Sequence, residues 1–288
     1  MAVRLKPLYK QVIFMTGATS SIGVATLHMA VEQGAKVFMV DRIDKEEELQ
    51  RMQDEMRAKG YDTAIAISDE ETEQLQFAAD QCLKTFGKID TWINNTGTTP
   101  QASHLKLSKK ETKALFEENF WGFVNGCKLA TTYLKDNGGA LINVGSAVDE
   151  AELNTMGLAS ASRHAIKGFT DTYRKELSQD KIPVSVSLVI PGPIQTEMEK
   201  PESSPLTSQD VVARAILKCA QKPIAEIGAS GMSARTFPLM EKFLPKIQSY
   251  FQKHPDSRDL VTSKKSWMAS GALALGGAFL FLKKSRII

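Results

Sequence analysis

A glycine-rich turn near the start of the sequence is the segment whose residues most clearly suit chemistry. An apolar run at residues 12–15 leads into TGATSSIG at residues 16–23, and a helical pattern then extends to about residue 33. Glycine lets the backbone approach a pyrophosphate, and the N–H groups that open a helix point at it. We therefore predict a dinucleotide-phosphate site, rather than a plain structural turn, formed by Gly17, Thr19, Ser21, Ile22 and Gly23.

Two charged residues follow the second apolar run, residues 36–40. Asp41 lies eighteen residues after Gly23, and Arg42 is next to it. A carboxylate at this place can accept hydrogen bonds from both ribose hydroxyls, which favours NAD, whereas an arginine can bind a 2′-phosphate, which favours NADP. We therefore expect NAD or NADP as the cofactor, with NAD slightly preferred.

The elements that must position these residues alternate along the chain. Further strand patterns lie at residues 63–67, 89–93, 140–144 and 184–190, with a last one near 224–227, and helical patterns lie between them. Capping boxes at residues 68–71 and 108–111 predict the starts of two helices. Short apolar strands that alternate with helices predict a doubly wound α/β fold with a parallel sheet covered on both faces.

Four motifs then occur in order: TGATSSIG at 16–23, NNTG at 94–97, GS at 145–146 and PGPIQT at 191–196. Together they resemble the short-chain dehydrogenase/reductase family over residues 8 to about 228. The resemblance implies one Rossmann-type domain with a sheet of about seven strands, assembly into homo-oligomers, and hydride transfer between a nicotinamide and a carbonyl or alcohol of a small-molecule substrate.

The resemblance also assigns roles to individual residues. Asn119 matches the asparagine that organises a proton-relay water, and Ser146 matches the serine that binds the substrate oxygen. Further cofactor contacts are implied after the fourth strand and in the loop that packs on the nicotinamide, at Asn95, Gly97, Pro191, Gly192, Ile194 and Thr196.

The departures from the family pattern concern catalysis. The family's Tyr-x-x-x-Lys pair falls, without a gap, on Ala159 and Arg163, and Ser21 replaces the middle glycine of the turn. Alanine has no titratable group, and losing a general acid costs roughly 10²–10⁴-fold in rate. The paired loss favours an impaired relative that binds a dinucleotide or serves as a scaffold. The alternative is an active oxidoreductase with a rearranged relay of Ser146, Asn119 and Arg163.

Composition excludes several other classes of protein. The chain is 42% hydrophobic and 24% charged, as globular proteins are, and its net charge of +3 gives no basic footprint for nucleic acid. The three cysteines are far apart and form no CxxC pair, which predicts reduced thiols and no metal site.

The C-terminal segment is predicted to be a separate module. Residues 267–282 carry no charge and are flanked by KK at 264–265 and KKSR at 283–286. As a helix they span about 24 Å, short of a ~30 Å hydrocarbon core, but the basic flanks favour a single-pass membrane anchor over a buried helix or an oligomer contact. We therefore expect a Rossmann domain at 1–230, a helical extension and linker at 231–265, and an anchor at 266–288 that holds the domain in the cytoplasm.

Overall fold

A parallel sheet of seven strands runs through the part of the chain that the structure describes. The structure is a computed structural model, and it describes residues 3–69, 72–95, 108–145, 157–191 and 208–229. The strand order is β3-β2-β1-β4-β5-β6-β7, and every neighbouring pair is parallel. The strands are β1 (Val12–Thr16), β2 (Lys36–Asp41), β3 (Thr63–Ile67), β4 (Thr91–Asn94), β5 (Gly139–Val144), β6 (Val184–Ile190) and β7 (Glu226–Gly228).

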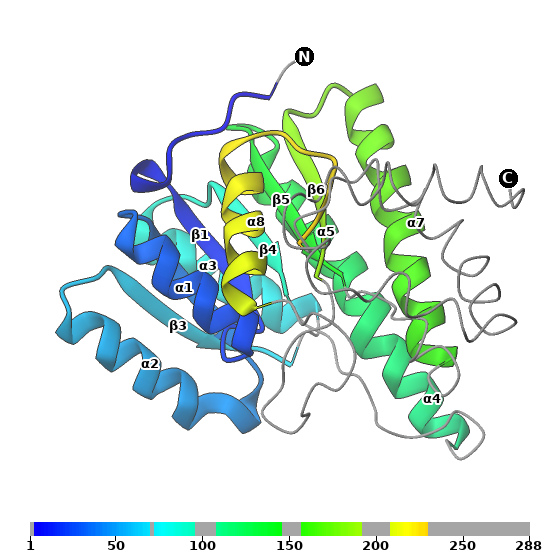
Figure 1. Cartoon of the computed structure of the whole chain (residues 1–288), viewed down its shortest axis with the longest axis horizontal. Helices are drawn as coiled ribbons and strands as arrows, with labels where there is room; N and C mark the ends of the chain where they lie inside the picture. Colours follow the sequence, from blue (N-terminus) through cyan, green and yellow to red (C-terminus); the bar gives the residue numbers. More distant parts are fainter. Residues whose placement is uncertain (1–2, 70–71, 96–107, 146–156, 192–207, 230–288) are drawn as a thin grey trace, which may run out of the picture. The chain divides into compact units, whose positions relative to one another are not determined.

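Helices join successive strands, as Figure 1 shows. They are α1 (Ser21–Glu32), α2 (Glu46–Ala58), α3 (Thr72–Phe86), α4 (Lys109–Phe116), α5 (Gly122–Leu134), α7 (Gly157–Gln179) and α8 (Gln209–Gln221). A π-helical turn, Glu117–Trp121, joins α4 to α5, and two 3₁₀ turns lie at Leu8–Lys10 and Ile43–Lys45. The predicted doubly wound α/β fold is confirmed.

Each face of the sheet packs against its own set of helices. Alternate residues of a strand point to opposite faces, so Ile13 and Met15 of β1 pack with α1, α2 and α8, whereas Val12 and Phe14 pack with α3, α5 and α7. All five residues of β1 are buried for this reason. Because both faces are covered, functional groups collect at the ends of the strands.

The predicted boundaries agree with most of the observed ones. The strands at 63–67 and 184–190 have the predicted bounds, but β4 begins at Thr91 rather than at residue 89. The capping box at 108–111 is confirmed, because Ser108 Oγ accepts from the Glu111 N–H and the Glu111 carboxylate accepts from the Ser108 N–H. The other predicted box, at 68–71, extends outside the described residues.

No helix in the described part of the chain is long and apolar enough to cross a membrane. The predicted extension at 231–265 and the predicted anchor at 266–288 lie outside the described residues.

Candidate dinucleotide site and catalytic helix

Predicted site residues follow the carboxyl ends of four strands of the sheet. Gly17 follows β1, Arg42 follows β2, Asn95 follows β4 and Pro191 follows β6. Strand order reverses between β1 and β4, which are neighbours in the sheet. Ligands of open α/β sheets bind at such a switch point, outside the carboxyl ends of the strands.

The phosphate turn is a short loop between β1 and α1. Gly17 has a φ of +60°, in the left-handed region that favours glycine. Ser20 caps α1: its Oγ accepts from the Gly23 N–H at 3.1 Å and donates to the Gly17 carbonyl at 2.8 Å. The Gly17 carbonyl is therefore engaged within the turn, and the N-terminus of a twelve-residue helix lies at the switch point.

Gly23 allows this turn to pack against the first turn of α1. A Cβ at this position would lie 2.4 Å from the Gly17 carbonyl oxygen and 2.5 Å from that of Ala18. A Cβ atom essentially never lies within 3.0 Å of another non-bonded heavy atom, and both obstacles here are backbone oxygens. The position therefore requires glycine if the loop is to keep this shape.

Asn95 holds the turn from the neighbouring strand. Its side-chain amide is buried and donates 2.9 Å hydrogen bonds to the Gly17 carbonyl and to Ser20 Oγ. Its backbone N–H also donates to Thr16 Oγ1 at 3.3 Å. The predicted cofactor residue Asn95 thus acts here by fixing the phosphate turn.

Asp41 and Arg42 differ in how their side chains are used. Asp41 is buried, with 8% of the residue exposed. Its carboxylate accepts three hydrogen bonds, from the N–H and hydroxyl of Thr19, at 2.8 and 2.9 Å, and from the Arg42 N–H at 2.9 Å. The Arg42 guanidinium is 41% exposed and forms a two-pronged ion pair with Asp44 at 3.0 Å. Asp41 therefore stabilises the loop, while Arg42 lies at its solvent-exposed rim.

These residues fit a dinucleotide. The turn around Gly17 and the N-terminus of a twelve-residue helix suit a pyrophosphate, and an arginine after β2 suits the 2′-phosphate of an adenosine ribose. In this site Gly17, Ser21 and Gly23 would surround the phosphates. Ser21, at the usual glycine position, is exposed and begins the helix.

Helix α7 contains Ala159 and Arg163, the residues onto which the resemblance maps the family's tyrosine and lysine. Ser162, Ile166 and Thr170, one turn apart, are buried and form its inner face. The Asn143 amide of β5 donates to Thr170 Oγ1 at 2.9 Å and fixes the rotation of the helix. Arg163 is next to this buried row and partly exposed. Ala159 lies one turn before Arg163 in the same helix.

The tyrosine of α7 serves a structural role. Tyr173 Oη lies 2.7 Å from Thr131 Oγ1 and donates to the Cys127 carbonyl at 3.2 Å, both on α5. Burial raises the pKa of its phenol. Tyr173 is fourteen residues beyond Ala159, about 21 Å along a helix, so it does not replace the absent phenol.

Asn119 lies within the π-helical turn Glu117–Trp121 and is buried, with 6% exposure. π-Helical turns are frequent at functional sites, because one extra residue turns a side chain out of the regular helical register. The family resemblance pointed to Asn119, but nothing in the sequence indicated the π-helical turn, since α4 and α5 have the continuous pattern of one helix.

The remaining predicted site residues lie outside the described residues. They are Gly97, Ser146, Gly192, Ile194 and Thr196. Pro191 is described and buried directly after β6. All three cysteines are buried, and burial raises the pKa of the thiols to about 12 for Cys82 and Cys127 and about 11 for Cys219.

Comparison with known proteins agrees with this geometry. The family model described as "short chain dehydrogenase" matches residues 11–206. The chain belongs to this family. It is 33% identical over 259 residues to "Uncharacterized oxidoreductase YxnA" of Bacillus subtilis, covering 85% of this chain and 72% of the relative. It is 28% identical to the 3-oxoacyl-[acyl-carrier-protein] reductase FabG of Thermotoga maritima, over 65% and 76% of the two chains.

Solved structures show the same fold. A short chain dehydrogenase from Mycobacterium smegmatis superposes with a TM-score of 0.67 at 19% sequence identity, covering 81% of this chain and 98% of that one. Membership of the family implies NAD(P) as the cofactor, without specifying which of the two.

Proposed function

We propose that this short-chain dehydrogenase binds a nicotinamide dinucleotide but is impaired in hydride transfer. The proposal rests on α7, where the resemblance maps the family's catalytic pair onto Ala159 and Arg163. The helix's own tyrosine, Tyr173, is hydrogen-bonded to α5. The phosphate turn, by contrast, has a complete set of supporting contacts.

The bound nicotinamide would supply or accept the hydride, and the protein must move the accompanying proton. Alanine has no ionisable proton, and an arginine side chain is not deprotonated in proteins. Arg163 can therefore hold a ribose hydroxyl or stabilise negative charge, but it does not act as a general acid. Loss of that acid alone lowers the rate roughly 10²–10⁴-fold.

The contacts of Asp41 and Arg42 favour NADP as the cofactor, although the sequence suggests a slight preference for NAD. Asp41 already accepts three protein hydrogen bonds, so a ribose would compete with Thr19 for its oxygens. Arg42 is half-exposed, and exchanging Asp44 for a 2′-phosphate would replace one bidentate pair by another. We therefore infer that Arg42→Ala weakens NADPH binding at least about tenfold and leaves NADH binding nearly unchanged. Arg51→Ala, on the exposed side of α2, is the matched control; equal losses for both nucleotides would contradict the assignment.

An active enzyme is the second candidate, and the names of the relatives favour it. YxnA and FabG are both named as redox enzymes. In that case Ser146, Asn119 and Arg163 would form a rearranged relay, and each of Ser146→Ala and Arg163→Ala would abolish turnover of a carbonyl substrate.

Restoring the lost pair distinguishes the two candidates. The double variant Ala159→Tyr/Arg163→Lys is compared with Ala161→Tyr/Arg163→Lys, which adds the same phenol two residues along the helix at an exposed position. NADPH oxidation is followed with a panel of small ketones and diketones. If the natural chain is impaired, its rate of NADPH oxidation should be at or below the detection limit. The rate of the first variant alone should then exceed that limit by at least about 100-fold. Turnover by the natural chain at about 1 s⁻¹ or faster, within the ordinary range of enzymes, would establish the second candidate.

We also propose, from the sequence alone, that residues 266–288 tether the domain to a membrane from the cytoplasmic side and that the domains form homo-oligomers. Removing residues 266–288 should release the protein into the soluble fraction of fractionated cells. If the share of the protein in the membrane fraction did not change, the proposed tether would be wrong. If the released domain sedimented as a monomer, the proposed homo-oligomer would be wrong.

A further inference from the structure

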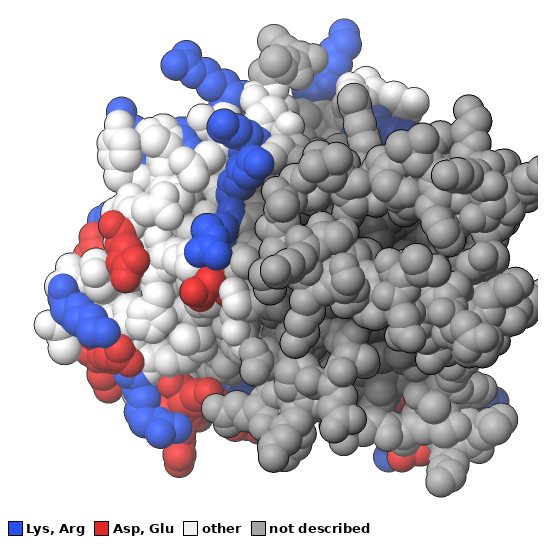
Figure 2. Space-filling view, viewed as in Figure 1, with Lys and Arg blue, Asp and Glu red and all other residues white. Residues whose placement is uncertain are grey.

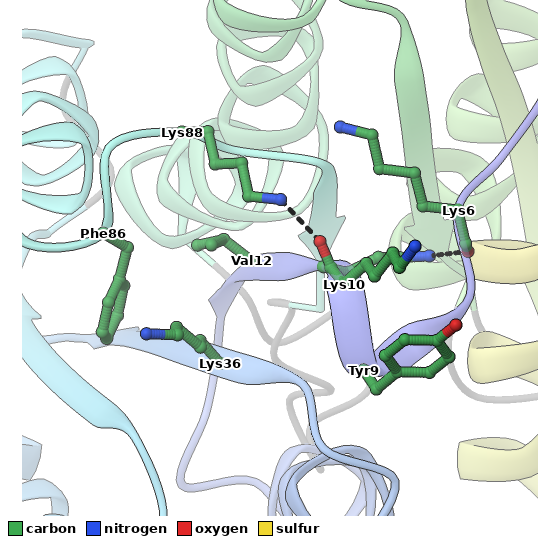
Figure 3. Close-up of a pocket in the computed structure, with 8 residues that line it drawn as sticks. Lys6, Tyr9, Lys10, Val12, Lys36, Phe86 and Lys88 are labelled. Carbon is green, nitrogen blue, oxygen red and sulfur yellow. Dashed lines mark hydrogen bonds between the residues drawn. The ribbon is translucent and has the colours of Figure 1, made fainter.

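A cleft lies at the amino-terminal ends of the strands, opposite the ends that carry the phosphate turn. Its volume is about 380 Å³, which lies within the roughly 300–1,000 Å³ of small-molecule sites. Four lysines and two aromatic residues form most of its lining (Figure 3): Lys6, Lys10, Lys36, Lys88, Tyr9 and Phe86. In Figure 2 the upper part of the described surface carries basic side chains, whereas lower down acidic and basic side chains are mixed.

One buried carboxylate organises the basic side of the cleft. Asp90, directly before β4, has a side chain that is 6% exposed. It pairs with Lys6 at 2.5 Å and with Lys88 at 2.8 Å, and it accepts the Val12 N–H at 2.8 Å. Lys88 also donates to the Lys10 carbonyl (Figure 3). Two ammonium groups are therefore held together by a single negative charge.

The cleft keeps a net positive charge. Lys36 pairs with the exposed carboxylate of Asp62 at 2.9 Å, and Lys10 forms no ion pair with any residue that the structure describes. Four positive charges thus face two negative ones, which leaves a balance of +2. Lys6, Lys36 and Lys88 each have side chains that are 42–48% exposed, so their remaining N–H donors are accessible to a ligand.

The aromatic residues give the cleft an apolar surface beside these charges. Tyr9 is 64% exposed, and Lys10 Nζ lies 5.6 Å from the centre of its ring. Lys36 Nζ lies 5.6 Å from the centre of the Phe86 ring, towards which it points in Figure 3. Such cation–π contacts keep the two lysines at the cleft rather than extended into solvent.

We propose that this cleft binds an anion bearing a phosphate ester with at least two negative charges. Preorganised ammonium groups match phosphate oxygens, because each charge-assisted hydrogen bond is stronger than one between neutral groups. The small volume suits a single headgroup or a free metabolite-sized phosphate. The site shares no residue with the phosphate turn, so it is independent of the dinucleotide function proposed above.

The test uses the full chain and two double variants. Lys10→Gln/Lys36→Gln removes two cleft charges but leaves Lys6 and Lys88 to neutralise Asp90. Lys128→Gln/Lys175→Gln removes the same charge from exposed positions on α5 and α7. Binding of inorganic pyrophosphate is measured by calorimetry at low salt. Binding to phosphatidylcholine vesicles with and without phosphatidylinositol bisphosphate is measured by co-sedimentation.

The cleft variant should weaken binding at least about tenfold, because two charged hydrogen-bond donors are lost, and the control should match the natural chain. Weakened pyrophosphate binding identifies a free phosphate as a sufficient ligand. Weakened vesicle binding without pyrophosphate binding identifies a lipid headgroup. If neither probe binds the natural chain, or if the cleft variant binds as the control does, the proposal is wrong; in the latter case pyrophosphate occupies another site, such as the phosphate turn.

Discussion

Replacing Gly23 by alanine tests the phosphate turn most severely. The added Cβ would lie 2.4 Å from the Gly17 carbonyl oxygen, so the two groups must separate by at least 0.6 Å to reach the 3.0 Å that real contacts respect. The Gly17 carbonyl cannot retreat without stretching its hydrogen bonds to Asn95 and Ser20. The turn must therefore distort.

Overpacking of this kind costs about 2 kcal/mol, within the usual range of 1–3. For a domain of this size the corresponding fall in Tm is about 4–8 °C. Because the distortion is in the cradle itself, the Kd for NADPH should also rise at least about tenfold.

Thermal unfolding and calorimetry with NADPH measure both effects, and Gly168→Ala is the control. Gly168 lies within α7, and an added Cβ there would meet nothing within 4 Å. Alanine at such a helical position should stabilise the protein by about 0.5–1 kcal/mol and leave NADPH binding unchanged. A Gly23→Ala protein with the natural Tm and natural affinity would refute the account of the turn.

Three further predictions concern groups within the described fold. Asp41→Ala leaves the Thr19 N–H and hydroxyl without their acceptor and should lower the free energy of unfolding by about 1–3 kcal/mol in urea titrations; an unchanged value would show that the contact is dispensable. Asn143→Leu removes the partner of Thr170 and of a second buried amide and should cost a similar amount, about 1–3 kcal/mol, by the same measurement. The buried thiols should resist Ellman's reagent at pH 8 until the protein unfolds, since burial raises the pKa of Cys127 to about 12. This folded-state pKa lies above the ordinary thiol value of about 8.5, at which the unfolded chain would lose the proton. The free energy of unfolding should therefore also fall as the pH rises beyond about 8.5. Rapid labelling of the native protein would contradict the burial.

Local patterns were sufficient for the sheet. β3 and β6 are short apolar runs bounded by polar residues, and their predicted bounds agree with the structure. The start of β4 was predicted two residues early because Ile89 is buried although it precedes the strand. Hydropathy reports burial, whereas a strand begins where the hydrogen-bonded ladder begins.

The contacts between distant segments could not be predicted in the same way. The sequence identifies Asp41 as a carboxylate at the end of β2, but its bonds to Thr19 depend on β1 and β2 being neighbours. The π-helical turn around Asn119 depends on packing and has no local signal. The basic cleft requires Lys6, Lys36 and Lys88 to meet from three separate segments.

The central claim is that the chain retains a dinucleotide site and lacks the proton donor for catalysis. The measurement that tests it most directly is NADPH binding by calorimetry, together with single-turnover oxidation of the bound NADPH by the panel of small ketones and diketones, which accept the hydride, in the natural chain and in Ala159→Tyr/Arg163→Lys. The account predicts binding by both proteins and oxidation only by the variant. It is contradicted if the natural chain fails to bind NADPH, or if it oxidises bound NADPH as fast as the variant does.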